Sequence, residues 1–587
     1  MNKRFKKSFF LSSAVVALAL SLTTAFAQGS QNPRQLYVKQ SLDIINPDND
    51  ITTSNANYYI TGSSNPSYPL YMNGYEVTNR GKYGSFGVYV SLSPGKNYVE
   101  LSQNGVSERV YITRTTGGSS SVATTKRMTK MFPIYDFGVR TSDKVKISCV
   151  APSGARVYAV VDGVRVELEQ AAATAVSGVP ANFRGYYYPN SYPQNQTTNL
   201  GKVTYYMTYA GVQTSWQSVG NLYAVGDNAN FIVEVDDENV MTFATPSATK
   251  PYNGVLRKGA TDRVVNQTED LYKLASGGWI RQNAVKPVVG YGDLRAVFSS
   301  AELSQTQTRD LYFFSCSKKP SYKFSQNGNT MSFRFYNTSG LSSVPYKNGR
   351  FFSYASAVQD GNDLVLSFTI KDNQVVWGYD VSYVDGGVRI IFKEKPFLGS
   401  SQKPLSNTVV CIDPGHGGTD SGALGVQGTK GPMEKDITLA TAYAVKDKLE
   451  SLGAYVVMTR TDDSFINLNG RNKFIHENNC DFFVSIHANS IAVTRDGTKT
   501  SGVEVYYNQP NSKQLATSLL ERMNYYTGRE KRNAFNSHYV VTLDPYLPSS
   551  LLEMGFMPNP IEYDDMCSPS GMANTAAAVA QSILDCF

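Results

Sequence analysis

The residues best suited to chemistry are two histidines and two glutamates in the last third of the sequence. His416 follows the apolar run VVCID, His487 lies near the end of FFVSIHAN, and Glu553 lies near the end of SSLLEMG. Glu434 begins a helical pattern after the Gly-rich segment GALGVQGTKGP. The chain contains only 4 histidines, so two of them at equivalent places are informative. Two neutral imidazoles and one carboxylate form the ligand set of a catalytic zinc ion, whose fourth position is left to water. The pattern therefore predicts a zinc site.

The segments that must position these residues alternate between strand-like and helix-like patterns over residues 406–587. The segment EKDITLATAYAVKDKLESLG keeps apolar residues three or four apart, and Gly453 ends the pattern. This alternation predicts an α/β domain with a mostly parallel central sheet. Sites in such sheets form at the carboxyl ends of the strands, where His416, His487 and Glu553 are expected. The strand-like runs are NTVVCIDPG, AYVVMTR, DFFVSIHAN, GVEVYYN and SSLLEMGF.

Six motifs in a fixed order run through the same segment. They are V-x-I-D-P-G-H-G-G-x-D-x-G-A at 410–423, E-K-D at 434–436, a degenerate V-x-x-T-R-x-x-D ending at Asp463, S-I-H-A-N at 485–489, G-V-E-V-Y-Y at 502–507 and L-L-E-x-G-F-x-x-N at 551–559. Together they resemble the zinc-dependent N-acetylmuramoyl-L-alanine amidases of the Amidase_3 family. The resemblance covers residues 407–587.

The resemblance implies a role for each residue. It makes His416, Glu434 and His487 the zinc ligands and Glu553 the catalytic acid/base. The implied substrate bond joins the lactyl carbonyl of N-acetylmuramic acid to the amine of L-alanine in peptidoglycan. Zinc polarises such a carbonyl and lowers the pKa of its water to about 7. Glu553 would then carry a proton from that water to the departing nitrogen.

Four further residues are candidates for supporting roles. Asn489 follows His487 by two positions and is expected either to bind substrate or to hold the loop. His538, in NSHYVVTL, is expected either to bind substrate or to support a metal ligand. Asp413 and Asp420 flank His416, and either can orient an imidazole that binds metal. For Asp413, a structural role at the strand end is an equal alternative.

Length and composition limit the class of protein. A chain of 587 residues predicts several domains. Aromatic residues make up 12% and charged residues 18%, which excludes a disordered or coiled-coil protein. The 6 cysteines include no CxxC pair, so a thiolate zinc site is not expected.

The N-terminus has the parts of a secretory signal peptide. Basic residues precede an apolar run from Phe9 to Leu22, and the tripeptide Ala25-Phe26-Ala27 follows. A helix over that run would span about 21 Å, short of a hydrocarbon core of about 30 Å. We therefore expect cleavage after Ala27, export of the mature protein to the cell envelope (periplasm or cell wall), and no stable membrane insertion afterwards.

Consecutive β-modules are expected ahead of the Amidase_3 catalytic domain at 406–587. Short runs rich in Tyr and Val, separated by turn signals, predict small β-sandwiches and barrels. Strict alternation over residues such as 331–336 predicts half-buried antiparallel strands. The Tyr/Pro/Asn-rich run GYYYPNSYPQNQ is expected to be a loop. The predicted division is a signal peptide at 1–27, a module resembling immunoglobulin domains at 28–114, a linker at 115–127, a β-rich module at 128–237, a module resembling bacterial SH3 domains at 238–290, and a module resembling the AMIN domain at 291–398.

Charge is divided unequally between the two parts of the chain. Residues 401–587 hold 15 basic and 20 acidic side chains, whereas residues 1–400 hold 40 and 28. Because cell-wall polymers are anionic, the basic modules are expected to hold the enzyme near its substrate. The expected function is a secreted peptidoglycan hydrolase, an autolysin. The alternatives are an envelope-binding protein with a degenerate amidase domain, and a zinc peptidase acting elsewhere on the stem peptide.

Peptidoglycan is the expected partner, and no nucleic acid is expected. Some members of the family carry an inhibitory helix after the H-A-N motif. Here Ser490–Ser501 is short and polar. An activator protein is therefore not expected to be required.

Overall fold

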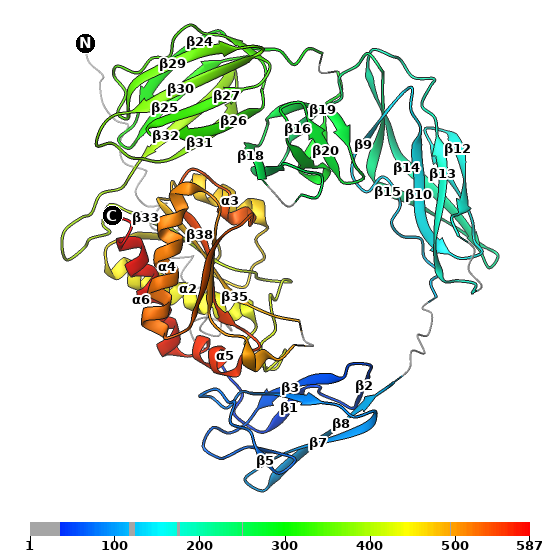
Figure 1. Cartoon of the computed structure of the whole chain (residues 1–587), viewed down its shortest axis with the longest axis vertical. Coiled ribbons are helices and arrows are strands. Elements are labelled where there is room, and N and C mark those ends of the chain that lie inside the picture. The colour runs from blue at the N-terminus through cyan, green and yellow to red at the C-terminus, as the bar shows by residue number, and fades with distance from the viewer. Residues whose placement is uncertain (1–35, 117–123, 173–175, 249–250, 291, 493–494) are drawn as a thin grey trace, which may run out of the picture.

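The structure is a computed structural model of the chain, and it describes residues 36–116, 124–172, 176–248, 251–290, 292–492 and 495–587. The signal peptide expected at 1–27 lies outside the described residues, as does most of the linker expected at 115–127. Four β-modules precede a C-terminal domain that carries the long helices, which confirms the expected multidomain organisation. The units follow one another round a ring, and the first module lies against the C-terminal domain (Figure 1).

Module 1 is a two-sheet sandwich. Its sheets have the strand orders β1-β3-β6 and β2-β8-β7-β4-β5. Alternate residues of the long strands point inward, and Ile60, Phe86, Leu101 and Ile112 between the sheets are fully buried. The strands are β1 Asp43–Asn46, β2 Ile51–Thr53, β3 Asn57–Ser63, β4 Tyr71–Met72, β5 Tyr75–Glu76, β6 Phe86–Ser91, β7 Gly95–Gln103 and β8 Val106–Arg114.

Module 2 consists of β9–β15, in the order β10-β13-β12-β11-β14-β15-β9. The run expected to be a loop begins inside a strand, because Gly185 to Tyr187 pair with β10. The burial of Tyr187 against the module core explains the difference. The strands are β9 Phe137–Arg140, β10 Val145–Pro152, β11 Arg156–Val161, β12 Val164–Gln170, β13 Pro180–Tyr187, β14 Thr197–Tyr209 and β15 Val212–Val225.

Module 3 contains β16–β22 and begins earlier than expected. Its first strand, β16, pairs with β19 and β22, so the predicted boundary at 237/238 is wrong. The apolar residues of β16 complete the core of this sheet and that of the next module. The elements are β16 Ile232–Val235, β17 Asn239–Phe243, β18 Pro251–Arg257, β19 Thr261–Gln267, β20 Leu271–Leu274, β21 Trp279–Arg281, η1 Gln282–Ala284 and β22 Val285–Pro287.

Module 4 has two four-stranded sheets, β24-β25-β32-β31 and β26-β27-β30-β29, and a short β23–β28 pair. The alternation predicted near residues 331–336 is confirmed, since Met331, Phe333 and Phe335 are buried. The strands are β23 Ala296–Phe298, β24 Ser300–Gln305, β25 Arg309–Ser315, β26 Tyr322–Asn327, β27 Thr330–Phe335, β28 Thr338–Gly340, β29 Phe352–Asp360, β30 Asp363–Ile370, β31 Val376–Val384 and β32 Gly387–Glu394.

The C-terminal domain is built on one sheet with the order β34-β33-β35-β38-β36-β37. The first four strands pair in parallel, β36 runs antiparallel to β38, and β37 runs parallel to β36. The helices pack against the sheet (Figure 1). The elements are β33 Val409–Pro414, α2 Glu434–Ser451, β34 Tyr455–Met458, α3 Leu468–Glu477, β35 Phe482–Asn489, η2 Gly497–Lys499, β36 Val503–Tyr507, η3 Pro510–Ser512, α4 Lys513–Thr527, β37 Lys531–Asn536, η4 Val540–Thr542, β38 Ser549–Phe556, α5 Pro560–Met566 and α6 Pro569–Leu584.

Modules 3 and 4 meet the C-terminal domain at a buried charge cluster. Arg257 of module 3 pairs with Asp380 of module 4 at 2.9 Å and with Asp544 of the C-terminal domain at 3.3 Å. His476 also contacts Asp544, with 2.6 Å between Nε2 and Oδ2. Removing one partner from a buried ion pair leaves the other charge uncompensated, so loss of any member of this cluster is expected to weaken the contact between the three units.

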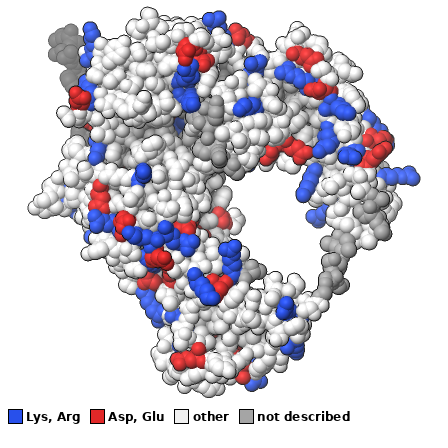
Figure 2. All heavy atoms as spheres, in the orientation of Figure 1, with Lys and Arg blue, Asp and Glu red and all other residues white. Residues whose placement is uncertain are grey.

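The surface offers no single region of one charge on the face shown in Figure 2, where acidic and basic side chains are interspersed over every unit. Among the described residues, no helix is both long enough and apolar enough to cross a membrane.

Candidate metal centre and catalytic cleft

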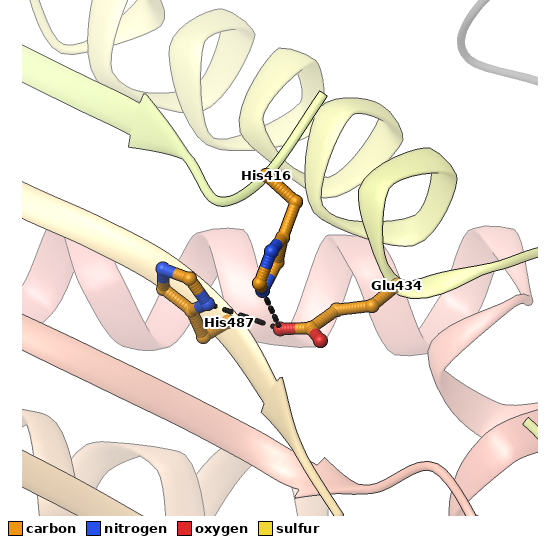
Figure 3. A group of neighbouring side chains, drawn as sticks. All are labelled: His416, Glu434 and His487. Atoms are coloured by element: carbon orange, nitrogen blue, oxygen red, sulfur yellow. Dashed lines mark hydrogen bonds and ion pairs between the residues drawn. The ribbon is translucent and has the colours of Figure 1, made fainter. Parts of the chain in front are cut away.

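His416, Glu434 and His487 come together at the carboxyl edge of the parallel strands. His416 lies just after β33 with a φ of 61°, Glu434 is the first residue of α2, and His487 lies near the end of β35. One possible ligand atom from each residue lies within 4.8 Å of the others. Figure 3 shows both imidazoles pointing toward the Glu434 carboxylate. The separations are 3.1 Å from His416 Nε2 and 3.0 Å from His487 Nδ1 to Glu434 Oε1. The three side chains therefore form one candidate metal site.

Glu434 is held as a carboxylate. Burial alone would raise the pKa of its carboxyl, but hydrogen bonds with His416 and His487 outweigh burial and place the pKa far below its usual range. The backbone N–H groups of Ala423 and Ala488 also donate to its two oxygens, at 2.7 and 3.0 Å. This carboxylate stays ionised at neutral pH, which favours a cation between the three side chains.

Asp420 orients His416 from the side away from the site. The distance from His416 Nδ1 to Asp420 Oδ2 is 2.8 Å, which leaves Nε2 facing Glu434. The carboxylates of Glu434 and Asp420 raise the pKa of His416 to about 8, although burial opposes them. A carboxylate on the second ring nitrogen is the usual support for a metal-binding histidine.

Asp413 has a structural role at the strand end and does not orient the His416 imidazole. Its buried carboxylate accepts hydrogen bonds from Thr459 and Ser485 and pairs with Arg471 at 2.5 Å. These contacts join β33 to β34, β35 and α3. Asp413 thus fixes the strand end from which His416 emerges.

Glu553 lies on β38, one strand away from His487. The two residues are partners in the parallel pairing of β35 and β38. Burial, together with the nearby charges of Glu434 and Glu504, raises the pKa of Glu553 to about 7. Its Oε2 is buried and has no hydrogen-bond partner among the described residues. A buried carboxyl that titrates near neutral pH is suited to proton transfer.

Glu504 is a site residue that sequence reasoning missed. It pairs with Glu553 across β36 and β38, and it is buried. Its carboxylate accepts hydrogen bonds from Asn489 Nδ2 at 2.8 Å, Tyr506 Oη at 2.6 Å and Arg532 Nε at 2.6 Å. The signal was the glutamate inside the motif G-V-E-V-Y-Y. Its contact with Asn489 supports the loop-holding interpretation of that asparagine.

One cavity of about 880 Å³ connects the predicted residues. His416, Glu434, His487 and Glu553 all line it, together with Asn489 and His538. His538 lies on the cavity wall nearest module 3. Its ring packs edge-on against that of Phe243, with 6.4 Å between the ring centroids. The fourth histidine, His476, is held by Asp544 in the charge cluster and does not line this cavity.

Residues 410–585 match the family model described as N-acetylmuramoyl-L-alanine amidase, Amidase_3. The germination-specific N-acetylmuramoyl-L-alanine amidase of Bacillus subtilis is 30% identical over 204 residues, which cover 31% of this chain and 81% of that protein. The chain belongs to the N-acetylmuramoyl-L-alanine amidase family. The expected enzyme class is thereby confirmed, and the match places it in the C-terminal domain.

One further curated relative and one solved structure are each similar to about a third of this chain. An uncharacterized protein of Bacillus subtilis, YqiI, is 36% identical over 181 residues, covering 31% of this chain and 85% of that protein. Among solved structures, the catalytic domain of CwlV, an N-acetylmuramoyl-L-alanine amidase from Bacillus (Paenibacillus) polymyxa var. colistinus, is 33% identical and matches with a TM-score of 0.28. That match covers 30% of this chain and 96% of the CwlV domain.

Proposed function

We propose that this amidase is an exported, zinc-dependent peptidoglycan hydrolase that cleaves the bond between N-acetylmuramic acid and L-alanine. One observation carries the proposal. The three candidate ligands and a carboxyl that titrates near neutral pH line the same cavity, in a domain of the amidase family.

The donor set fits zinc. Two imidazole nitrogens and one carboxylate oxygen, all within 4.8 Å of one another, match the three protein ligands of a catalytic zinc site. His416, Glu434 and His487 would hold the ion, with Asp420 and the Ala423 and Ala488 amides supporting them. When bound, zinc supplies Lewis acidity, which polarises a carbonyl and acidifies a water.

Glu553 performs the proton transfers in this proposal. As a carboxylate it accepts a proton from the attacking water, and as a carboxylic acid it returns the proton to the nitrogen of L-alanine. A pKa near 7 keeps both forms accessible at neutral pH. The Glu504 carboxyl accepts hydrogen bonds from Arg532 and Tyr506, and its proximity helps to raise the pKa of its neighbour Glu553, which favours the protonated form of Glu553. Asn489 and His538 both line the cavity and are proposed to contact the substrate, although Asn489 also holds its loop through a hydrogen bond to Glu504.

The β-modules are proposed to retain the enzyme at the envelope. We assign module 1 as immunoglobulin-like, module 3 as SH3-like and module 4 as AMIN-like, within the domain limits given above as corrected for β16. The basic and apolar N-terminal segment supports export by a signal peptide. The described part of Ser490–Ser501 contains only the short η2 and no α-helix, which supports activity without an activator protein.

Two other functions fit the site less well. A degenerate, purely binding domain is disfavoured because every member of the proposed constellation is present and lines one cavity. A zinc peptidase would use the same ligand types, but the family assignment disfavours it. Incubation of purified sacculi with full-length, zinc-loaded protein decides between these functions. The proposal expects soluble stem peptides that begin with a free L-alanine amine.

A further inference from the structure

A second cavity, of about 410 Å³, lies between module 1 and the C-terminal domain. It adjoins the catalytic cleft, because Ser490 lines both cavities and Ala423 of the cleft is followed directly by Leu424 of the second cavity. Its module 1 wall includes Asn55, Asn57 and Tyr58. Its volume falls in the range of about 300–1,000 Å³ that is typical of small-ligand sites. The cleft thus continues beyond the candidate metal site onto a module outside the family domain.

We infer that module 1 forms one wall of a subsite for the stem peptide of peptidoglycan. The inference rests on the proposed function and extends it, because it assigns substrate recognition to a module far away in the sequence.

The contact that creates this cavity is well fixed. The buried side chain of Gln427 accepts a hydrogen bond from the Lys39 backbone N–H at 2.9 Å and donates to the Lys39 carbonyl and to Ser85 Oγ, at 2.9 and 3.0 Å. Asp564 accepts from the backbone N–H of Tyr83 at 2.7 Å. The buried Gln427 amide is hydrogen-bonded through both its oxygen and its nitrogen, and a buried amide satisfied in this way favours one defined arrangement over a loose encounter.

Two more contacts lie at the edge of the cavity itself. Tyr59 Oη donates to the Pro558 carbonyl at 2.7 Å, and Lys430 Nζ lies 3.0 Å from Asp43 Oδ2. Tyr59, Pro558 and Lys430 all line the cavity. These two contacts therefore join the two walls of the cavity.

The lining suits a short, acidic peptide. Asn55 is exposed and Asn57 is half-buried, and both present side-chain amides that pair with peptide groups. Leu424 and Val426 provide an apolar floor from the loop between His416 and Glu434. Arg495 adds a cation, against the single lining carboxylate of Asp48, whereas Lys430 is already paired with Asp43. Stem peptides carry free carboxylates, and charge-assisted hydrogen bonds to such groups are about twice as strong as neutral ones.

A glycan strand fits this second cavity less well than a stem peptide does. A glycan strand is a long, continuous polymer that needs a groove open at both ends, whereas contacts between module 1 and the C-terminal domain join the two walls of this cavity. A stem peptide is a short branch that begins at the bond to be cut. It is the part of the substrate that a side cavity next to the metal site can hold.

The test compares two soluble muropeptides with the same disaccharide, one bearing a dipeptide stem and one a tetrapeptide stem. Full-length, zinc-loaded protein is expected to cleave the tetrapeptide substrate with a kcat/KM about tenfold higher. Asn55→Glu on module 1 and Arg495→Glu on the opposite wall should each lower that preference about tenfold, because they place negative charge beside the substrate carboxylates.

Matched controls carry the same changes outside the cavity. Asn49→Glu on module 1 and Lys499→Glu near Arg495 alter exposed residues that do not line it, and both should keep the wild-type preference within twofold. An unchanged preference in Asn55→Glu would overturn the inference. The inference would also be overturned if Asn55→Glu changed how kcat/KM depends on glycan length, measured with a disaccharide and a tetrasaccharide, but not how it depends on stem length.

Failure of the proposed function is distinguishable from failure of this inference. If wild-type protein released no L-alanine amine from either muropeptide or from sacculi, the proposed function itself would be wrong. If it cleaved both muropeptides with equal kcat/KM, only the assignment of the cavity to the stem peptide would be wrong.

Discussion

Glu434 and Glu553 face the same cavity but have opposite electrostatic environments. Glu434 accepts hydrogen bonds from two backbone N–H groups and contacts both imidazoles. Its pKa therefore lies far below the usual range. Glu553 sits on the neighbouring strand with a buried, unpartnered Oε2, and burial raises its pKa to about 7. The residue type is the same, so the difference comes entirely from the surroundings.

The difference explains how one cavity serves two kinds of chemistry. A permanently charged carboxylate binds a cation well and transfers protons poorly. A carboxyl poised near neutral pH does the reverse. Exchanging the two environments would disable both functions, which makes each glutamate a separate target for experiment.

The largest effect is expected on the metal side. Glu434→Gln keeps the shape of the side chain but removes the charge, so zinc affinity should collapse and activity should fall by about 10³-fold or more, since Lewis-acid stabilisation is worth several kcal/mol. Metal content by atomic absorption and release of L-alanine amines measure the two losses. Chelation of wild-type protein should reproduce the loss, and zinc should restore wild type but not the variant. Stoichiometric zinc in an active Glu434→Gln protein would contradict the ligand assignment.

The next effect separates chemistry from metal binding. Glu553→Gln should retain one zinc per chain while kcat falls by about 10²–10⁴-fold, the usual contribution of a positioned acid/base. Equilibrium dialysis and steady-state kinetics on one preparation give both numbers. A metal-loaded Glu553→Gln protein with near-normal kcat would remove Glu553 from the mechanism.

A smaller effect is expected from the support of His416. Asp420→Asn should raise the zinc dissociation constant by about 10–100-fold, because the imidazole loses its orienting carboxylate. Activity at saturating zinc should remain close to that of wild type. Asp462→Asn, an exposed change on the neighbouring loop, is the control and should leave zinc affinity unaltered. Equal zinc affinity in the two variants would show that Asp420 does not support the site.

The smallest effect concerns a carboxylate outside the cavity. Hydrogen bonding to Arg522 lowers the pKa of Asp585 to about 2 and links α4 to α6. A lowered pKa stabilises the fold above the unfolded value of about 3.9, and this contribution is lost as the pH falls toward 2.

Asp585→Asn should therefore lower the free energy of unfolding by about 1 kcal/mol at pH 7, after allowance for the partial exposure of the side chain. This loss should become smaller below about pH 4. At pH 7 the thermal unfolding midpoint (Tm) of the C-terminal domain should fall by about 2–4 °C. Unlike the changes at Glu434 and Glu553, this one should leave kcat/KM within twofold of wild type. A Tm of Asp585→Asn equal to that of wild type at pH 7 would contradict the stabilising role of the Asp585–Arg522 pair.

The sequence predicted the residues of the cavity because they lie where strands end. His416 and His487 follow apolar runs, and Glu434 opens a helix, so their positions could be inferred from local patterns together with the amidase motifs. Glu504 was missed, because its contacts with Arg532 and Tyr506 depend on how β36 lies beside β37 and β38. The raised pKa of Glu553 likewise depends on packing that no local pattern encodes.

The ring of modules was beyond prediction for a related reason. Gln427 meets Lys39 and Ser85 across hundreds of residues, and no periodicity marks such a contact. The strand β37 was also missed, since most of its residues are exposed and it lacks alternation. The boundary between modules 2 and 3 was misplaced because β16 is apolar like the strands before it and only its partners, β19 and β22, assign it to module 3.

The most direct test of the central claim is mass spectrometry of sacculi digested by the full-length, zinc-loaded protein. The account predicts new free amino groups on L-alanine, intact glycan strands and no cleavage within the stem peptide. It also predicts that Glu553→Gln protein with bound zinc releases at least about 10²-fold less of the same product. Cleavage between amino acids or between sugars, or equal release by the variant, would contradict it.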